Sequence, residues 1–428
     1  MLLSDSYNMA FRNLLAEMKD ITVVDRPVNV DLEVSRLLAQ DVTAPILFKD
    51  INGMRAAGNI WSTRDRIAAA LKISKEELMS KMLEALSSPS DPRQVDSAPF
   101  LEDVREEFDL TKLPIPRYYP GDAGRYVTSA VAVAEQDGKR NLSFHRMLLL
   151  DQRNFALRLV PRHLYTMWRN AQAKGEDLPV AFCMGLCPPV LLAAATSTDF
   201  DTDEARIASS LKERTVGGPL DLFELPSGLR VPAQAEVVFE GRITSRMVDE
   251  GPFVDITGTY DSVRPGPVFE VDRLYMRKDP IFHVLFPGGY EHFLLMGLPR
   301  EPVIYRTVNQ VVPRVHAVRL TEGGCCWLNG IVSITKNKEG DGTNAALAAL
   351  TAHPSMKKVV VVDEDIDIYD DRQVEWAEAT RFQASNSLTV INNAAGSSLD
   401  PSADGTTSKV AIDATRPFGT KNFSRAVL

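Results

Sequence analysis

The pattern of apolar and polar positions changes in character along the chain. In the first hundred residues, two short apolar runs, 21–24 and 45–48, are typical of strands. Two segments, 62–65 and 74–77, then show the Ser-x-x-acidic signature of a capping box, and each predicts a helix. Apolar residues recur at helical spacing over 78–86, so the second helix is expected to pack on a core. This part is therefore mixed α and β.

Strand patterns dominate between about residue 110 and residue 286. The preceding segment, 87–99, is rich in Ser, Pro and Asp and predicts a linker or long loop. Many strands with few regular helices are typical of a barrel or a sandwich. The predicted strands are 127–134, 146–151, 221–225 and 235–244, and the predicted helices are 163–173 and 203–213.

From residue 302 onwards, strand and helix patterns alternate, which predicts an α/β domain. A chain of 428 residues is also too long for one ordinary core, so two or three domains are expected. The predicted strands here are 316–320, 327–334, 358–362 and 387–391, and the predicted helices are 343–352 and 373–382.

Charge and hydropathy narrow the class of protein. The net charge of -9 argues against nucleic acid or an anionic membrane as the main partner. No apolar run reaches the roughly 18 residues that a membrane span needs, and the most apolar segment, 180–195, is interrupted by Gly and Pro. Residues 1–10 contain Asp5 and no apolar region of the kind that marks a secretion signal. A cytoplasmic protein is expected.

Four cysteines are too few for a disulfide framework in a chain of this length. Their spacing also lacks the second half of a zinc-finger motif. Structural buried thiols are the favoured interpretation, with metal and redox roles as alternatives. The cysteines are Cys183, Cys187, Cys325 and Cys326.

Several motifs of other protein classes are incomplete. No Gly-rich dinucleotide or P-loop signature occurs, and the six histidines have no local zinc spacing. Asp363, Asp365 and Asp367 begin like a calcium loop, but Ile368 and Val374 stand where glycine and a bidentate acid are needed. A solvated acidic loop is the favoured interpretation there. The residues alone indicate a soluble, multidomain protein and favour an enzyme.

A series of short segments, in order along most of the chain, resembles the motifs of UbiD-type decarboxylases. The segment Asp-Glu-Gly-Pro-Phe-Val-Asp, at 249–255, together with 235–241, is similar to the most specific part of the family. The chain is therefore identified as a member of that family. The other matching segments are 141–146, 160–163, 202–205, 287–292, 361–367, 407–409 and 412–415.

The resemblance implies a divalent metal, usually Mn²⁺, held against a cofactor phosphate by Asn141, His163 and Glu204. One amide oxygen, one imidazole and one carboxylate suit Mn²⁺ or Mg²⁺ better than a closed zinc site. The implied cofactor is prenylated FMN, with K⁺ as a further ion. The residues that the resemblance assigns to the cofactor are Ser143, Phe144, His145, Arg146, Arg162, His163 and Lys409.

The resemblance also implies a catalytic network of Arg146, Glu250 and Asp255. Arginine carries a permanent charge and a fork of donors, so it can orient a carboxylate. The second acid would deliver a proton after carbon dioxide leaves. Many relatives have glutamate where this chain has Asp255, which shortens the reach of that proton. Without the resemblance, the two acids indicate only a solvated turn.

The family fold is multidomain, α/β and β, with a central split β-barrel of the flavin-reductase-like type. It implies an N-terminal α/β region over 1–109, a cofactor-binding barrel over 110–300 and a C-terminal α/β domain over 301–428. It also implies a flavin prenyltransferase as the separate supplier of the cofactor. The family commonly forms homodimers or homohexamers.

The segment 296–302 and the short length resemble a compact archaeal-type branch. One activity of that branch is reversible decarboxylation of anhydromevalonate phosphate, an unsaturated acid of isoprenoid biosynthesis. An aromatic or heteroaromatic acid is the alternative substrate, and a non-catalytic flavin- or metal-binding protein is the alternative class. His145 and His292 are expected to line the site. A phosphorylated substrate would need basic groups, and four arginines lie near the 160–163 motif in the sequence: Arg153, Arg158, Arg162 and Arg169.

Overall fold

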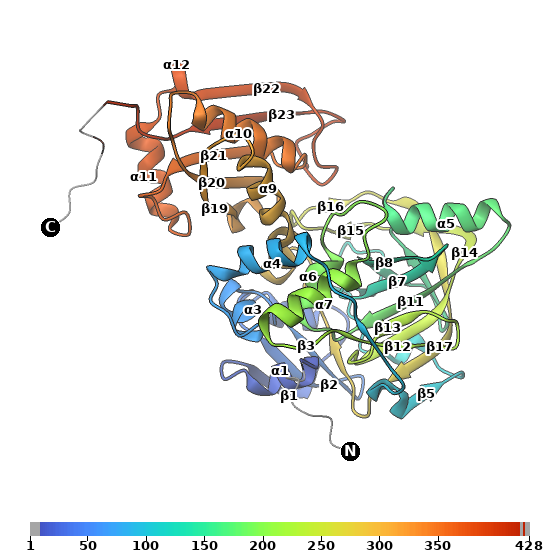
Figure 1. Ribbon diagram of the computed structural model, residues 1–428. Coiled ribbons are helices and arrows are strands. Elements are labelled where there is room, and N and C mark those ends of the chain that lie inside the picture. Colours follow the sequence, from blue (N-terminus) through green and yellow to red (C-terminus); the bar gives the residue numbers. More distant parts are fainter. Residues whose placement is uncertain (1–8, 420–422, 424–428) are drawn as a thin grey trace. The chain divides into compact units, whose positions relative to one another are not determined.

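A computed structural model of the chain describes residues 9–419 and residue 423 (Figure 1). The chain forms two compact units, Met1–Leu295 and Met296–Leu428. Within the described residues, no helix is long and apolar enough to cross a membrane.

The first unit begins with a four-stranded sheet in the order β1-β2-β3-β18. β1 pairs with β2 in parallel, and β2 pairs with β3 antiparallel. Both strands predicted from the first apolar runs are confirmed, although each extends further than predicted. The elements are α1 (Phe11–Glu17), β1 (Thr22–Pro27), α2 (Glu33–Leu38), β2 (Ile46–Ile51), β3 (Met54–Gly58), α3 (Arg64–Ala70), α4 (Glu77–Ser87) and β18 (Ile281–His283).

The two predicted helix starts have different outcomes. At α3 the capping residue is Thr63, whose side chain accepts from the N–H of Arg66. The prediction of Ser62 as the cap is wrong, because the Ser62 hydroxyl bonds to the carbonyl of Thr43 instead. At α4 only half of the predicted capping box forms: the Glu77 carboxylate accepts from the Ser74 N–H at 2.8 Å, but the N-cap is Glu76 and no side chain caps the helix.

A nine-stranded sheet makes up most of the rest of the first unit. Its main path is β6-β9-β10-β17-β14-β11-β7-β8, with β6 and β8 at the edges, and it curls into an open barrel (Figure 1). Its strands are β5 (Asp103–Arg105), β6 (Tyr126–Val127), β7 (Val131–Gln136), β8 (Lys139–Phe144), β9 (Met147–Leu149), β10 (Asn154–Leu157), β11 (Leu178–Met184), β14 (Val237–Glu250) and β17 (Arg264–Met276).

Smaller elements surround this sheet. The predicted helix 163–173 is confirmed without change as α5, and the helix predicted at 203–213 is α7. The segment predicted as a linker contains a short strand, β4, which pairs with β12, so that prediction is wrong in part. The elements are β4 (Arg93–Val95), η1 (Pro99–Glu102), η2 (Leu110–Lys112), α5 (His163–Ala173), α6 (Pro188–Ala194), α7 (Glu204–Thr215), β12 (Asp221–Glu224), β13 (Arg230–Pro232), β15 (Phe253–Val254), β16 (Tyr260–Asp261) and α8 (Tyr290–Gly297).

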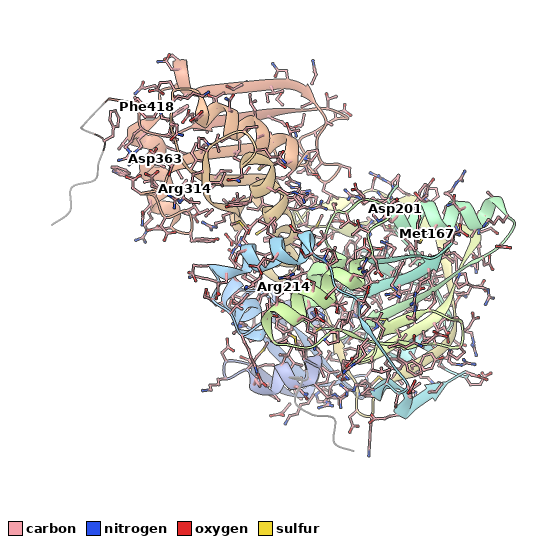
Figure 2. The ribbon with its side chains drawn as sticks, viewed as in Figure 1. Met167, Asp201, Arg214, Arg314, Asp363 and Phe418 are labelled. Carbon is pink, nitrogen blue, oxygen red and sulfur yellow. The ribbon has the colours of Figure 1, made fainter. Side chains whose placement is uncertain are left out.

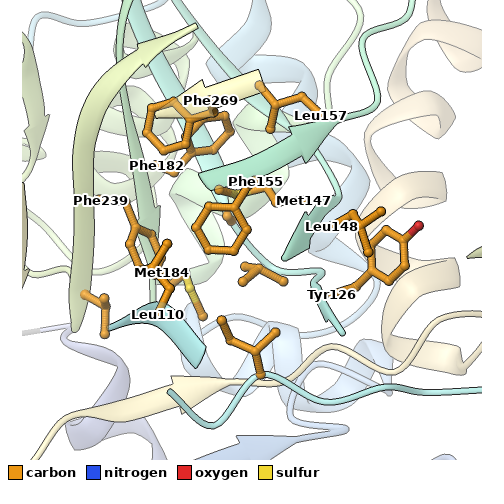
Figure 3. Close-up of a cluster of buried hydrophobic side chains, with 14 of the residues drawn as sticks. Leu110, Tyr126, Met147, Leu148, Phe155, Leu157, Phe182, Met184, Phe239 and Phe269 are labelled. Atoms are coloured by element: carbon orange, nitrogen blue, oxygen red, sulfur yellow. The ribbon is translucent and has the colours of Figure 1, made fainter. Parts of the chain in front are cut away.

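The interior of the barrel is filled by aromatic and aliphatic side chains (Figure 3). The rings of Phe182 and Phe269 meet edge to face with centroids 4.7 Å apart, and those of Phe155 and Phe239 do so at 5.6 Å. Such pairs add attraction beyond the burial of their area. The packed interior holds the strand ends that carry the polar residues described below.

The second unit contains a five-stranded sheet in the order β19-β20-β21-β23-β22. Its inner pairs, β20 with β21 and β21 with β23, are parallel, as expected for an α/β domain. β23 was not predicted as a strand. The elements are η3 (Leu298–Arg300), α9 (Glu301–Val308), β19 (Arg314–Leu320), η4 (Glu322–Gly324), β20 (Asn329–Thr335), α10 (Asp341–Ala352), β21 (Lys358–Asp363), α11 (Asp371–Arg381), α12 (Ala384–Ser387), β22 (Leu388–Ala394) and β23 (Thr407–Asp413).

The prediction of a solvated acidic loop after β21 is wrong in part: Asp365 and Asp367 are exposed, but Asp363 is not. Asp363, labelled in Figure 2, is buried and accepts from Arg381 Nη1 at 2.8 Å. Arg381 also holds both carboxylate oxygens of Asp365, at 2.9 and 2.7 Å. Asp363 and Asp365 therefore both bind Arg381, the last residue of α11. The sequence pattern gave no sign that this arginine lies beside them.

The four cysteines, all within the described residues, form no disulfide, and Cys183, Cys187 and Cys326 are buried, as predicted for structural thiols. Cys325 is half-buried. Burial raises the pKa of the Cys183 thiol, which makes it unreactive at neutral pH.

Candidate active site

A buried arginine and three acids form the centre of the candidate site. Arg146 lies between β8 and β9, and its guanidinium is over the ring of Phe253, 4.8 Å from the centroid. Its Nε and Nη2 donate to the two oxygens of Glu250 at 2.9 and 2.8 Å. Nη1 donates to Asp255 Oδ2 at 2.9 Å. The three residues that the family resemblance assigns to catalysis therefore lie in direct contact.

The third acid, Asp261, was missed in the sequence. Arg146 Nη2 donates to Asp261 Oδ2 at 3.0 Å, and the Asp261 side chain is only 6% exposed. The available signal was a hairpin: β15 and β16 pair Phe253 with Asp261, so the strand that follows Asp255 returns toward Arg146. The family motif quoted from the sequence ended at residue 255.

The local chain folds so that the three acids converge. Glu250 ends the long strand β14, and Gly251, at φ +96°, turns the chain sharply, as glycine does at low cost. The N–H of Asp255 then donates to the carbonyl of Thr259, which closes the β15–β16 hairpin. A Cβ on Gly266 would lie 2.2 Å from the carbonyl oxygen of Leu157, so glycine is needed where β10 approaches Glu250.

The electrostatics of the site follow from burial and from these ion pairs. Burial opposes the charge on Arg146, but Glu250 and the two aspartates outweigh it and raise the pKa of the guanidinium. Burial, together with the negative charge of Glu250, raises the pKa of the Tyr126 hydroxyl. Burial lowers the pKa of His292, and the charge of Asp255 opposes that effect. Arg146 is therefore permanently charged.

A second group of polar side chains lies at the edge of the barrel. Asn141 in β8, His163 at the start of α5 and Glu204 at the start of α7 converge. Asn141 Nδ2 is 3.3 Å from Glu204 Oε2 and 3.5 Å from His163 Nδ1, and His163 Nδ1 is 3.6 Å from Glu204 Oε1. The three residues assigned to the metal are therefore brought together. Among the described residues, no group of three His, Cys, Asp or Glu side chains could hold a metal ion.

The charge of Glu204 makes this group suitable for a cation. Its side chain is 2% exposed and accepts from the Leu142 N–H at 2.9 Å and from the Thr198 hydroxyl at 3.0 Å. In the part of the chain that the structure describes, no Lys or Arg pairs with it. Because a buried carboxylate needs a counter-charge, a divalent ion fits here. Thr198 was another residue that the sequence did not indicate.

Ser143 and His145 favour an inward amide oxygen on Asn141. Burial lowers the pKa of His145 to about 4, so the ring is neutral at pH 7, and Nδ1 donates to the carbonyl of Arg158 at 3.1 Å. His145 Nε2 then accepts the single hydroxyl hydrogen of Ser143, 3.0 Å away. In the structure the Asn141 NH₂ group faces Glu204 and the amide oxygen lies 2.9 Å from Ser143 Oγ. Because the single hydroxyl hydrogen of Ser143 goes to His145, exchanging the two amide atoms would let the NH₂ group donate to Ser143 and turn the oxygen toward a cation held by Glu204 and His163.

The remaining residues predicted to bind the cofactor form no hydrogen bond or ion pair with Arg146 or its three acids in the described part of the chain. Phe144 is half-buried at the end of β8, and Arg162 is exposed, with Nη1 donating to Ser197 Oγ at 2.6 Å. Lys409 lies in β23 of the second unit, and its ammonium group donates to the carbonyl of Pro354. Burial lowers its pKa. That Lys409 reaches a cofactor phosphate stays a prediction.

Comparisons with known proteins agree with this arrangement. The family model described as the 3-octaprenyl-4-hydroxybenzoate carboxy-lyase Rift-related domain matches residues 93–290. The N-terminal and C-terminal domain models of the same carboxy-lyase match residues 12–86 and 293–414. The chain is similar to an anhydromevalonate phosphate decarboxylase of Methanosarcina mazei, with 43% identity over 98% of this chain and 99% of the relative.

The fold is likewise similar to solved structures of the UbiD-class enzyme HmfF from Pelotomaculum thermopropionicum. The complex with FMN has a TM-score of 0.94 and 36% identity, and covers 98% of this chain and 97% of that chain. An evolved dimeric form in complex with prFMN has a TM-score of 0.91, 34% identity and the same coverage. The predicted multidomain fold with a split barrel is thereby confirmed.

The family models, the named relative and the solved structures identify the chain as a carboxy-lyase, an enzyme that removes carbon dioxide from an acid. The matches cover the whole length of the fold. The chain belongs to the UbiD family of decarboxylases.

Proposed function

We propose that this chain uses prenylated FMN to decarboxylate an α,β-unsaturated acid, and that the acid is anhydromevalonate phosphate. The observation that carries the proposal is the contact of Arg146 with Glu250 and Asp255 in a buried site. The 43% identity to a relative named for that substrate supports the choice of acid. The reaction is non-oxidative and reversible.

The roles of the three residues follow from their chemistry. Arg146 orients the substrate carboxylate through its permanent charge and through the N–H on Nη1 that Asp255 does not take, since Glu250 already occupies its Nε–Nη2 fork. Glu250 fixes the plane of the guanidinium through two parallel hydrogen bonds. Asp255, whose side chain is 19% exposed, protonates the carbon that has lost carbon dioxide and is then reprotonated from solvent.

The metal and cofactor would be held by residues of the first unit. Asn141, His163 and Glu204 fit Mn²⁺ or Mg²⁺, which would offset the charge of the cofactor phosphate. Prenylated FMN, when bound, supplies an electron sink for the electrons released as carbon dioxide leaves. Ser143, Phe144, His145, Arg162 and, from the second unit, Lys409 are the proposed contacts for the cofactor, with K⁺ as an additional ion.

Two further parts of the proposal concern partners. A flavin prenyltransferase supplies the cofactor, as the resemblance to the family implies. The chain assembles with itself, as a homodimer or a homohexamer. The dimeric form of the similar HmfF enzyme supports self-assembly.

The test is a decarboxylation assay. The chain is co-expressed with a flavin prenyltransferase, purified with Mn²⁺ and K⁺, and given anhydromevalonate phosphate beside a panel of aromatic and heteroaromatic acids. We expect carbon dioxide release from the phosphorylated acid. An Arg146→Ala variant, loaded in the same way, is the control for background release.

The outcomes separate the candidate functions. If only an aromatic acid is turned over, the proposed substrate is wrong and the proposed decarboxylation is retained. Protein that retains prenylated flavin yet releases carbon dioxide from no acid in the panel would overturn the reaction in favour of a binding protein.

A further inference from the structure

We infer that Asp261 is a positioning residue for decarboxylation: it holds the Arg146 guanidinium in place while Asp255 gains and loses its proton. The inference rests on the proposed function, since it assumes that Asp255 exchanges a proton during turnover. Asp261 contacts neither the proposed metal ligands nor the residues assigned to the cofactor other than Arg146.

The hydrogen bonds of Arg146 identify what Asp261 adds. A guanidinium has five N–H donors. Glu250 takes two, Asp255 takes one on Nη1, and Asp261 takes the second hydrogen of Nη2. Among the described residues, none accepts the remaining hydrogen, on Nη1. The guanidinium is therefore fixed on its Nε–Nη2 side and open on the side of Asp255.

Asp261 is surrounded by donors and positive charges. Its Oδ1 accepts from the N–H of Ser262 at 2.9 Å and lies 3.5 Å from Arg264 Nη2. Its Oδ2 lies 3.5 Å from Arg158 Nε, in addition to its bond with Arg146. Each oxygen of Asp261 therefore faces a positive charge.

The charges of the cluster explain why a third acid is useful. With Asp255 ionised, three arginines face three carboxylates, and with Asp255 protonated the cluster carries one net positive charge, which suits an incoming substrate carboxylate. Without Asp261, the protonated state would carry two, which strengthens the pull on the proton of Asp255 to leave. Asp261 thus keeps Asp255 able to hold the proton that it must deliver.

The test compares Asp261→Asn with the parent enzyme, both loaded with cofactor. Asparagine keeps the shape and one acceptor but removes the charge. We expect kcat/KM to fall by about tenfold to a hundred-fold, because a small displacement of an orienting group has effects of this size. We also expect the fall of activity at high pH to move down by roughly one pH unit, since the loss of a nearby negative charge favours the ionised form of the proton donor.

Several charged and titratable groups surround Asp255, the proton donor, and affect the pH dependence of activity. Each of them is unchanged in the variant, so the shift reports on residue 261. They are Arg146, Arg158, Arg264, Glu250, Asp122, Tyr126 and His292.

Two variants serve as controls. Asp261→Glu retains the charge and should recover most of the activity and the parent pH profile. Asp365→Asn removes a carboxylate that contacts the buried Arg381 in the second unit. This variant should keep the kcat/KM and the pH profile of the parent enzyme. An Asp261→Asn enzyme with the parent kcat/KM, or with the parent pH profile, would overturn the inference.

A crystal structure of the Asp261→Asn protein without substrate gives a readout independent of turnover. We expect Arg146 to turn away from its position between Glu250 and Asp255. If the parent enzyme decarboxylates nothing, the proposed function fails, and this structure still decides whether Asp261 positions the arginine. An unmoved guanidinium would then sink the inference as well.

Discussion

Two buried arginines, one in each unit, hold several carboxylates, and only one of them lies in the site proposed for catalysis. Arg146 contacts Glu250, Asp255 and Asp261, and Arg381 contacts Asp363 and Asp365. Both guanidiniums also lie over an aromatic ring, at 4.8 Å and 5.1 Å from the centroid. A cluster of this composition is therefore not a sign of catalysis by itself.

The difference lies in which acid is held by two hydrogen bonds. Around Arg146 the doubly held acid is the buried Glu250, and Asp255, at 19% exposure, receives one bond. Around Arg381 the arrangement is reversed, since the doubly held acid is the more exposed Asp365 and the singly held Asp363 is buried. A proton donor must be both reachable and loosely held, and only the first cluster provides such an acid.

The largest effect is expected from Arg146→Ala. We expect kcat/KM to fall on the order of 10⁴-fold, because the variant loses both orientation of the substrate and control of the proton donor. Activity is measured on cofactor-loaded protein whose fold is checked by circular dichroism. Turnover near that of the parent would remove the distinction between the two clusters.

Arg381→Ala should act on stability instead. It removes one of the two arginines beside the buried Asp363 and leaves Arg416, so we expect the free energy of unfolding to fall by about 1–3 kcal/mol. The measurement is denaturant unfolding, followed by kcat/KM of the folded fraction. A catalytic loss comparable to that of Arg146→Ala would show that the second cluster also takes part in the reaction.

Glu204→Gln tests a third buried acid, which has no arginine. We expect Mn²⁺ affinity to fall on the order of a hundred-fold, because the variant removes the only negative charge of the ligand set. Bound metal is measured after dialysis, with Glu236→Gln, a buried acid paired with two arginines elsewhere in the unit, as the matched control. Equal metal content in the Glu204→Gln and Glu236→Gln proteins would show that Glu204 does not bind the metal.

The smallest effect is expected from Asp365→Asn. The hydrogen bond to Arg381 lowers the pKa of Asp365, so its ionised form stabilises the fold above its ordinary pKa of about 4. We expect the variant to be less stable by under about 1 kcal/mol at pH 7, since the acid is partly exposed. The difference should vanish as pH falls through the lowered pKa. A difference that grows toward acid would be inconsistent with this ion pair.

The sequence predicted local structure well where one pattern was sufficient. Helix α5 was predicted with its observed bounds, since its apolar face repeats regularly. Strand β17 was missed because Pro265, Gly266 and Pro267 are typical of a turn. In the fold those residues pair with the end of β14, where the absence of a side chain on Gly266 is required.

The candidate site was predicted through family motifs and not through physical patterns. Arg146 and Glu250 are 104 positions apart, and nothing in the spacing indicates that they meet. Asp261 lay outside the recognised motif, and only the pairing of β15 with β16 brings it back to Arg146. The sequence patterns did not say which strands pair, either across the barrel between Arg146 and Glu250 or within the β15–β16 hairpin.

The hairpin of β15 and β16 has a consequence for how the site can be changed. All three acids that contact Arg146 come from one contiguous stretch, residues 250–261, while the arginine comes from elsewhere in the barrel. The strand register that anchors this stretch is set by β14 and β17 and not by the hairpin itself. Replacing this one segment would therefore change all three carboxylates around Arg146 at once. Within the barrel sheet, only the last residue of β14, Glu250, would be altered.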